Sequence, residues 1–295
     1  MRTVDTATLR IAYEDEGPPD GTPVVLLHGF PYDIRAFDAV VPDLARAGCR
    51  VIVPYLRGFG PTRFLSDATP RSGEQAALGA DVLALMDALA LGPAVLAGYD
   101  WGGRAACVVA ALWPERARGL VSCNGYNILD TAASVVPAAP EQERRYWYQY
   151  YLHCERGRAG LAADRRAFCR LLWRLWSPSW AFDDATFERT APSFDNPDFV
   201  DVAVQSYRHR FGYAPGDPAL VEIEQRLAQR PTIGVPTVVL HGDDDEVGPA
   251  WQSERHANHF TGPYVRQVVP GVGHNLPQEA PGSFTLAVLG LLSRG

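Results

Sequence analysis

Residues 98–103 have the sequence Gly-Tyr-Asp-Trp-Gly-Gly, and this stretch decides the fold predicted for the chain. The apolar run at 93–97 predicts a short buried strand before it, and residues 104–113 predict a helix after it. Small residues on both sides of Asp100 permit the crowded strand-to-helix turn that pushes one side chain into a cleft. Serine is the usual residue at the centre of such a turn, so the aspartate is informative.

An aspartate in this position indicates a particular kind of nucleophile. Its carboxylate is ionised at neutral pH and can attack without a general base. It suits alkylating electrophiles, such as epoxide carbons or carbon–halogen bonds, because water can cleave the alkyl ester that results. The structural alternative is that Asp100 only caps the following helix, since aspartate is a favoured N-cap residue.

The composition argues against several classes of protein. The chain has 295 residues, enough for one large domain or two modest ones, and a formal net charge of −7. Without a basic tract, that charge disfavours nucleic acid or an anionic membrane as a partner. We see neither the apolar run of a signal peptide nor an apolar stretch long enough to span a bilayer. Five cysteines without a disulfide or zinc spacing favour a reduced, cytoplasmic protein.

Two blocks of the chain alternate predicted strands with predicted helices. In the first block we expect strands at 24–27, 51–53, 94–97 and 120–123, with helices near 34–47, 74–91 and 103–113. The pattern returns with strands at 236–240 and 264–269 and a helix near 282–293. This alternation predicts an α/β fold, with a mainly parallel sheet and helices on both of its faces.

The segment between the blocks, 129–234, has a different character. It has no convincing buried strand, is dense in tyrosine and tryptophan, and carries charged helical stretches such as 141–157 and 217–230. These features predict a helical cap inserted over the sheet. We therefore expect a core domain of 1–128 and 235–295 and a cap domain of 129–234. Most of the cap aromatics are expected to form the core of the cap itself.

The loop after the first predicted strand can supply part of an oxyanion hole. His28-Gly29-Phe30-Pro31 follows the strand at 24–27, and the backbone N–H of Phe30 can act together with that of Trp101. The His28 side chain itself is expected to have a mainly structural role beside the site.

An acid and a base follow in the required order. Asp245 closes a Gly-Asp-Asp-Asp run after the strand at 236–240, and His274 ends a tight loop after the last strand. We expect His274 to be the base and Asp245 to be the acid that orients it. The other usual position for this acid holds Asn124, which cannot stabilise an imidazolium by charge.

The chain is similar to proteins of the α/β-hydrolase fold over nearly its whole length. Four motifs carry this resemblance, at 28–31, 98–103, 242–245 and 271–274. Within that fold it resembles the branch of epoxide hydrolases and haloalkane dehalogenases, which use an aspartate nucleophile. The resemblance implies a cofactor-independent hydrolase acting on a small-molecule epoxide with water, and leaves monomer or homodimer open. We expect no metal, since His256 and His259 lack the glutamate of a His-Glu-x-x-His motif.

The resemblance also implies a role for two cap tyrosines. In epoxide hydrolases of this fold, two such tyrosines hydrogen-bond the epoxide oxygen and protonate the developing alkoxide, which is a poor leaving group. Tyr148 lies in a segment that resembles the first tyrosine motif, and Tyr207 resembles the second. Tyr150 or Tyr151 could replace Tyr148 if the helix register differs, and all of these rings could instead be cap core.

Further residues are expected to contact the substrate: His28, Pro31, Trp101, Trp147 and Tyr151.

A haloalkane or haloacid dehalogenase is the alternative that the resemblance leaves open. Trp101 matches the halide-binding tryptophan of haloalkane dehalogenases, but Phe30 stands where many of them have asparagine. Fluoroacetate dehalogenases share Arg104, yet they have histidine where Tyr148 stands and an acid where Asn124 stands. A third reading is a binding protein of this fold that has lost turnover, which an intact triad disfavours.

Overall fold

A nine-stranded sheet forms the centre of the computed structural model, which describes residues 1–293. The strands run in the order β1-β2-β4-β3-β6-β7-β8-β9, and β5 pairs beside β2. Their bounds are β1 Arg2–Asp5, β2 Leu9–Glu16, β3 Thr22–Leu27, β4 Cys49–Pro54, β5 Arg63–Phe64, β6 Ala94–Gly98, β7 Ala117–Cys123, β8 Thr237–Gly242 and β9 Tyr264–Val269. Every neighbouring pair from β4 to β9 is parallel, which confirms the mainly parallel sheet.

The antiparallel edge of the sheet was not predicted. β1 pairs with β2, and β2 with both β4 and β5, all antiparallel. The residues of β1 are mostly exposed, and β2 mixes buried apolar with charged positions. Such edge strands lack the continuous apolar run that marks a strand buried on both faces.

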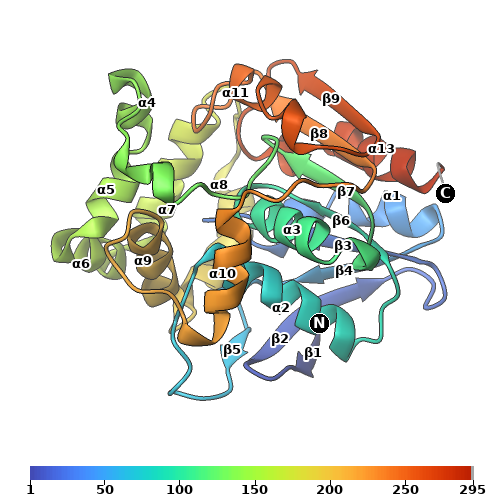
Figure 1. The fold of residues 1–295 in the computed structure, drawn as a ribbon, viewed down its shortest axis with the longest axis horizontal. Coiled ribbons are helices and arrows are strands. Elements are labelled where there is room, and N and C mark those ends of the chain that lie inside the picture. Colours follow the sequence, from blue (N-terminus) through green and yellow to red (C-terminus); the bar gives the residue numbers. More distant parts are fainter. Residues whose placement is uncertain (294–295) are drawn as a thin grey trace.

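Helices cover the sheet and confirm the layered architecture. α2 (Gln75–Ala88) packs against α3 (Asp100–Leu112), which lies in front of the sheet in Figure 1, whereas α1 (Val41–Arg46) packs against α13 (Pro281–Leu292). The helix predicted near 34–47 is instead a short 3₁₀ turn followed by α1. Two further short helices are α11 (Trp251–Glu254) and α12 (Leu276–Glu279).

Only helices and loops connect β7 to β8, all within the described chain. They are α4 Pro140–Arg145, α5 Trp147–His153, α6 Glu155–Ala163, α7 Arg165–Trp176, α8 Asp184–Thr190, α9 Phe199–Arg210 and α10 Val221–Ala228. The stretch predicted at 141–157 is broken at Tyr146 and at Cys154, whose backbone is extended. In Figure 1 α4 to α9 lie to the left of the sheet, and α10 packs against α2. We keep the name cap for residues 129–234; its boundaries remain a prediction.

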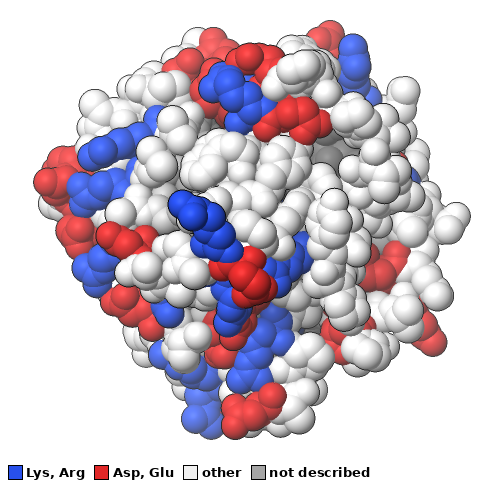
Figure 2. All heavy atoms as spheres, turned by 90° about the vertical axis from the view of Figure 1, so that its left-hand side faces the viewer, with Lys and Arg blue, Asp and Glu red and all other residues white. Residues whose placement is uncertain are grey.

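Polar contacts join the cap to the loops at the ends of the strands. The indole N–H of Trp173 donates to the carbonyl oxygen of Pro31 at 2.8 Å, and the hydroxyls of Thr190 and Ser193 donate to the buried carboxylate of Asp33. On the side of the molecule that faces left in Figure 1, acidic and basic side chains are interspersed (Figure 2). None of the helices within 1–293 combines the length and apolarity needed to cross a membrane.

Candidate active site

A strand-to-helix turn exposes Asp100, as the sequence predicts. Asp100 is the first residue of α3, directly after β6 and Tyr99. Its backbone φ is 50°, a positive value that residues other than glycine rarely adopt. The turn is crowded: a Cβ on Gly102 would lie 2.0 Å from the carbonyl oxygen of Leu27, and one on Gly29 would lie 2.5 Å from the Asp100 Cβ. Only glycine fits at either position.

The carboxylate of Asp100 is held by the loop after β3 and does not cap α3. The Phe30 N–H donates to Asp100 Oδ1 at 2.8 Å, whereas the N-cap residue of α3 is Tyr99. The backbone N–H of Trp101 belongs to the first turn of α3, where amides have no acceptor within the helix. Of the two amides predicted to form an oxyanion hole, the Phe30 N–H therefore contacts the carboxylate directly, the role of the Trp101 N–H stays a prediction, and the helix-cap alternative is wrong.

His274 lies between two carboxylates. Its Nδ1–H donates to Asp245 Oδ2 at 2.8 Å, and its Nε2 is 3.6 Å from Asp100 Oδ2. All three side chains stand beyond the carboxyl ends of parallel strands, which is where ligands bind in open α/β sheets. The three residues predicted from separate motifs are thus brought together by β6, β8 and β9.

The protonation states of these groups depend on one another. Burial lowers the pKa of His274, but the charge of Asp245 and the contact with Asp100 outweigh it and raise the pKa to about 10. Burial raises the pKa of both carboxyl groups, and the charge and hydrogen bonds of His274 more than reverse this, so both stay below their usual value. Near neutral pH the resting site therefore holds a protonated imidazole between two carboxylates.

Asn124 has a role that its sequence position did not reveal. It follows β7 with a φ of 69°, and its Nδ2 donates to Asp245 Oδ2 at 2.5 Å. Val247 N–H donates to the other oxygen of Asp245 at 2.7 Å. Asn124 was interpreted only as a missing acid, whereas it helps to fix the acid that is present.

Tyr148 and Tyr207 meet on the cap side of the site. Tyr148, on α5, and Tyr207, on α9, are both buried, and their rings are in edge contact with centroids 5.3 Å apart. Tyr150 instead bonds Glu143 through its hydroxyl, and Tyr151 stacks on Phe168. The helix register therefore turns Tyr148, rather than its neighbours, toward Tyr207.

Two cap residues orient the hydroxyl of Tyr148. Arg210 can only donate, and its Nη1 donates to Gln149 Oε1 at 3.0 Å, which fixes the orientation of that amide. The Gln149 Nε2 then donates to the Tyr148 oxygen at 3.0 Å. Since the oxygen is accepting, the Tyr148 O–H is free to donate elsewhere. Burial raises the pKa of both Tyr148 and Tyr207, so both phenols are neutral donors near neutral pH.

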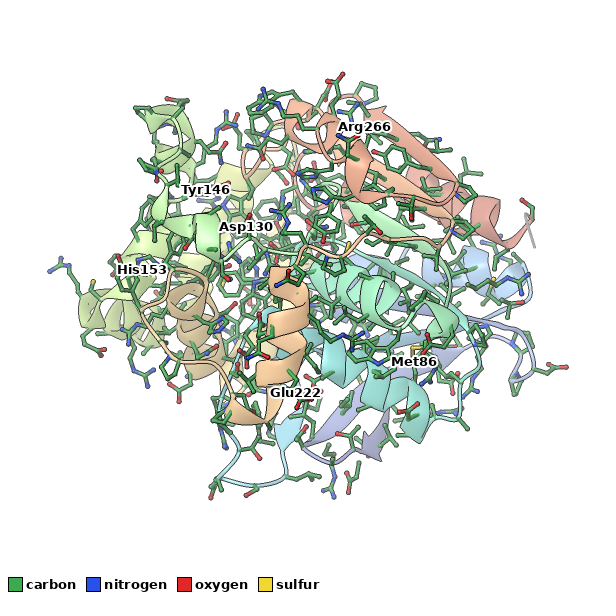
Figure 3. All side chains as sticks on the ribbon, in the orientation of Figure 1. Met86, Asp130, Tyr146, His153, Glu222 and Arg266 are labelled. Atoms are coloured by element: carbon green, nitrogen blue, oxygen red, sulfur yellow. The ribbon has the colours of Figure 1, made fainter. Side chains whose placement is uncertain are left out.

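A cavity of about 220 Å³ joins these groups. Of the predicted residues it is lined by Asp100, His274 and Tyr148; the other lining residues include Arg104, Asn124, Tyr126, Tyr146, Gln149, Arg210 and Val247. Tyr146, labelled in Figure 3, contributes from the junction of α4 and α5. Trp101 and Tyr207 lie behind this lining, both fully buried and with their ring centroids 6.1 Å apart.

None of the five residues expected to contact substrate lines this cavity: Trp101 lies behind the lining, and the other four also lie outside it. Both ring nitrogens of His28 are used by backbone, one on Gly29 O and one on the Leu56 N–H, and burial lowers its pKa to about 4. The carbonyl of Pro31 accepts from the cap, as described above. Trp147 and Tyr151 pack on Phe168, and all three rings are partly buried. Motif position alone could not distinguish a lining residue from one that supports the lining.

One group of side chains in residues 1–293 has ligand atoms close enough to hold a metal ion. The carboxylates of Glu74 and Glu224 and the imidazole of His209 have such atoms within 4.8 Å of one another. The Glu74 carboxylate also accepts from Ser72 Oγ and the Asp217 N–H, and Glu224 accepts from the Ala76 N–H. These bonds join the start of α2 to α10 and to the loop at residue 217, and the contact of His209 with Glu74 at 3.2 Å joins it to α9, which is a sufficient structural role for the group.

Comparisons with known proteins agree with this architecture. A crystal structure of a "putative epoxide hydrolase" from Klebsiella pneumoniae is 46% identical in sequence, with a TM-score of 0.96 over 98% of this chain and 96% of that one. Epoxide hydrolase A of Mycobacterium tuberculosis is 27% identical over 99% of this chain and 97% of its own length. A haloalkane dehalogenase of Mycobacterium marinum is 39% identical, but over only 47% of this chain and 46% of its own.

The family model for the alpha/beta hydrolase fold matches residues 22–281, which include the strand-to-helix turn, the cap and both loops that carry the acid and the base. The chain belongs to the alpha/beta hydrolase fold family.

Proposed function

We propose that the protein is an epoxide hydrolase that forms an alkyl ester on Asp100 and converts an epoxide to a vicinal diol. One observation carries the proposal: the buried, neutral phenol of Tyr148 lines the cavity that also holds a carboxylate nucleophile, and the neutral phenol of Tyr207 packs against it from behind the lining. An epoxide oxygen needs such donors, because an alkoxide does not leave unaided at neutral pH. The names of the Klebsiella and M. tuberculosis relatives support the same activity.

The first step forms the ester and opens the ring. The Phe30 N–H holds Oδ1 of Asp100, so Oδ2 attacks the epoxide carbon and the carbon–oxygen bond of the ring breaks. One tyrosine gives its proton to the developing alkoxide and is left as a phenolate. Ester formation removes the negative charge of Asp100, which is one of the two that raise the pKa of His274. The imidazolium then loses its proton to the phenolate, which restores a neutral base.

The second step hydrolyses the ester. Neutral His274, oriented by Asp245, takes a proton from water as that water attacks the ester carbonyl carbon. The oxyanion that forms on Oδ1 is stabilised by the N–H groups of Phe30 and Trp101. Collapse breaks the bond between the carboxyl carbon and the ester oxygen, and that oxygen leaves in the diol with the second proton of the attacking water. Asp100 is thereby returned as a carboxylate beside a protonated His274. The net reaction consumes one epoxide and one water, with no cofactor.

Product analysis on matched substrates tests the proposal. Purified protein is incubated with styrene oxide and aliphatic epoxides, and in parallel with 1-bromobutane and fluoroacetate, and diol and halide are both quantified. We expect diol formation that Asp100→Asn abolishes and no comparable halide release. Halide release without diol formation would reject epoxide hydrolysis.

A haloalkane dehalogenase is the second candidate, and one observation favours it. The indole N–H groups of Trp101 and Trp176 are buried and, within residues 1–293, have no hydrogen-bond acceptor. Both rings pack against Phe30, with centroids 5.3 and 6.5 Å away. Two such weak donors are suited to a departing halide. The same Asp100 ester would form, so only the leaving group separates the candidates.

The remaining assignments belong to the same proposal. Residues 129–234 form the cap over a core of 1–128 and 235–295, as the all-helical connection between β7 and β8 supports. Five free cysteines, four of them buried, support work in a reducing compartment such as the cytoplasm. The substrate is a small molecule, and monomer and homodimer both remain open.

A further inference from the structure

Two arginines line the proposed epoxide site without a carboxylate partner. Arg104, on α3, is only 7% exposed, and Arg210 is the last residue of α9. Among residues 1–293 the hydrogen bonds of Arg104 reach only the carbonyl oxygen of Asn127, at 3.4 Å. Those of Arg210 reach only Gln149 Oε1, and its Nε is buried without an acceptor. Each guanidinium has five N–H donors, so most of them are unused.

Another buried arginine shows what a satisfied guanidinium looks like in this fold. Arg57 is 4% exposed, and its Nε and Nη2 donate to the two oxygens of Asp81 at 2.6 and 2.7 Å. Burial of a charge costs free energy unless the charge is paired. Arg57 is paired through two hydrogen bonds to one carboxylate. Arg104 and Arg210 differ from Arg57 because neither guanidinium has a carboxylate partner among residues 1–293.

The charges around the cavity do not balance. Asp100 and Asp245 supply two negative charges, whereas His274, Arg104 and Arg210 supply three positive charges, which leaves one positive charge in excess. The two arginines also repel each other: burial and the charge of Arg210 lower the pKa of Arg104 to about 10, against the opposing charge of Asp100. A bound anion would remove both the excess and the repulsion.

We propose that Arg104 and Arg210 form an anion subsite and that the substrate is a small epoxide bearing a carboxylate or a phosphate. The inference rests on the proposed epoxide hydrolase activity and names its substrate class. A guanidinium fork matches the oxygen pairs of both anions. The cavity, at about 220 Å³, favours a small substrate.

Kinetics with charged and neutral epoxides of one shape test the subsite. The substrates are oxirane-2-carboxylate, oxiranylmethyl phosphate and the neutral oxirane-2-carboxamide. We expect kcat/KM for one of the anions to exceed that for the amide by roughly 10- to 100-fold, the range that a charge-assisted hydrogen bond supplies. The preferred anion shows whether the substrate carries a carboxylate or a phosphate. Equal kcat/KM values for both anions and the amide would overturn the proposal.

Variants separate anion binding from the contact of Arg210 with Gln149. Arg210→Gln should raise KM for the preferred anion by roughly 10- to 100-fold without raising KM for the amide, while the loss of its bond to Gln149 lowers kcat for both substrates alike. Arg210→Lys should restore part of the preference. Arg208→Gln is the matched control on α9, since Arg208 already has Glu155 as partner at 2.9 Å. If Arg210→Gln lowers kcat for all substrates but leaves KM for the preferred anion unchanged, Arg210 only positions Gln149 and Tyr148, and the subsite is rejected.

A binding measurement keeps this test separate from the activity itself. Cyclopropanecarboxylate has the shape and charge of oxirane-2-carboxylate but cannot be opened by Asp100. Calorimetry should detect its binding to the wild-type protein, and weaker binding to Arg210→Gln, even if no epoxide is turned over. Absence of diol from every epoxide would then reject the proposed function alone, whereas equal binding of cyclopropanecarboxylate and its amide would reject the subsite alone.

Discussion

His274 is the residue whose charge state changes most during the proposed cycle. At rest it is a cation between Asp100 and Asp245, with a pKa raised to about 10, and in that form it cannot accept a proton from water. Conversion of Asp100 to a neutral ester removes one of its two carboxylate neighbours, so its pKa falls when a base is needed. The charge state of Asp100 therefore sets the pKa of His274. In the second step Asp245 alone orients the imidazole.

Replacing His274 should stop the cycle after the first step. In His274→Gln, Asp100 can still attack and the tyrosines can still protonate the alkoxide, but water is not activated. Intact-mass spectrometry should show the protein heavier by one epoxide molecule, with the added mass on the peptide that contains Asp100. The chain has no lysine, but Cys154 is an exposed thiol, so the experiment is done with Cys154→Ser in the background. A variant that stays unlabelled while Tyr148 and Tyr207 are intact would contradict an Asp100 ester.

The two cap tyrosines should be needed in the first step only. Tyr148→Phe or Tyr207→Phe removes a general acid, which typically costs ~10²–10⁴-fold in rate. In rapid-quench experiments each variant should accumulate the ester more slowly, and the double variant should form almost none. Tyr150→Phe is the control, because its hydroxyl bonds Glu143 instead. Full epoxide turnover by both single variants would identify the rings as cap core and favour the dehalogenase.

At the scale of elements, the site is a set of short loops held by parallel strands. The strand-to-helix turn positions Asp100, the loop after β3 supplies the Phe30 N–H, and the loops after β8 and β9 carry Asp245 and His274. Hydrogen bonds tie these loops to one another: Asp243 after β8 accepts from the Gly271 N–H after β9 at 2.6 Å. The geometry of the triad therefore depends on glycines that let these segments approach.

Gly102 should be the least tolerant of these glycines. A Cβ there would lie 2.0 Å from the Leu27 carbonyl oxygen, which belongs to the sheet and cannot swing away. We expect Gly102→Ala to lower the free energy of unfolding in urea by about 1–3 kcal/mol or more. Gly290→Ala is the control: it lies in α13 with open space around it, and alanine should gain ~0.5–1 kcal/mol there. Equal stability of Gly102→Ala and wild type would contradict this account of the turn.

The elements that carry a motif could be predicted from the sequence, and those that depend on packing could not. Each predicted strand overlaps an observed one. For most of them the reason is that a buried parallel strand is a continuous apolar run, whereas β9, at the edge of the sheet, is partly exposed. The antiparallel edge at β1, β2 and β5 lacks that run. Gln149 and Arg210 were also missed as lining residues, since the way a cap helix faces the core is set by tertiary packing. A signal was present: Arg210 follows Tyr207 by three residues, one helical turn.

At the scale of the whole molecule, the cap and the sheet enclose a charged site that neither would bury alone. Cap residues contact His274: the Ser177 hydroxyl, just after α7, accepts from the His274 backbone N–H at 2.9 Å. Trp176 packs its ring against the imidazole, with centroids 5.2 Å apart. The cap thereby removes water from His274. Because His274 and the two carboxylates are paired in this buried site, the free energy of unfolding is expected to depend on pH.

This coupling predicts a specific dependence of stability on pH. The folded pKa of His274 is raised from 6.5 to about 10, so its stabilising charge is fully present below pH 6.5 and is lost as the pH rises through 10. Asp100 and Asp245 have lowered pKa values, so their contribution is present above about pH 3.8 and is lost as the pH falls. The difference in unfolding free energy between wild type and His274→Gln should therefore be largest at pH 4–6.5. A difference that does not decline toward pH 10 in urea titrations would contradict a protonated His274.

In the proposed mechanism Asp100 itself, and not water, forms the new bond to carbon. If it does, water attacks the carboxyl carbon of the ester, and the carbon–oxygen bond that Asp100 made stays in the diol. With enzyme in excess over epoxide in H₂¹⁸O, a single turnover should release diol with an ordinary oxygen, and the heavy oxygen should appear in the Asp100 peptide. Direct attack of water on the epoxide predicts the reverse. A diol that contains ¹⁸O from the first turnover, with none on Asp100, would make Asp100 a base and contradict the account.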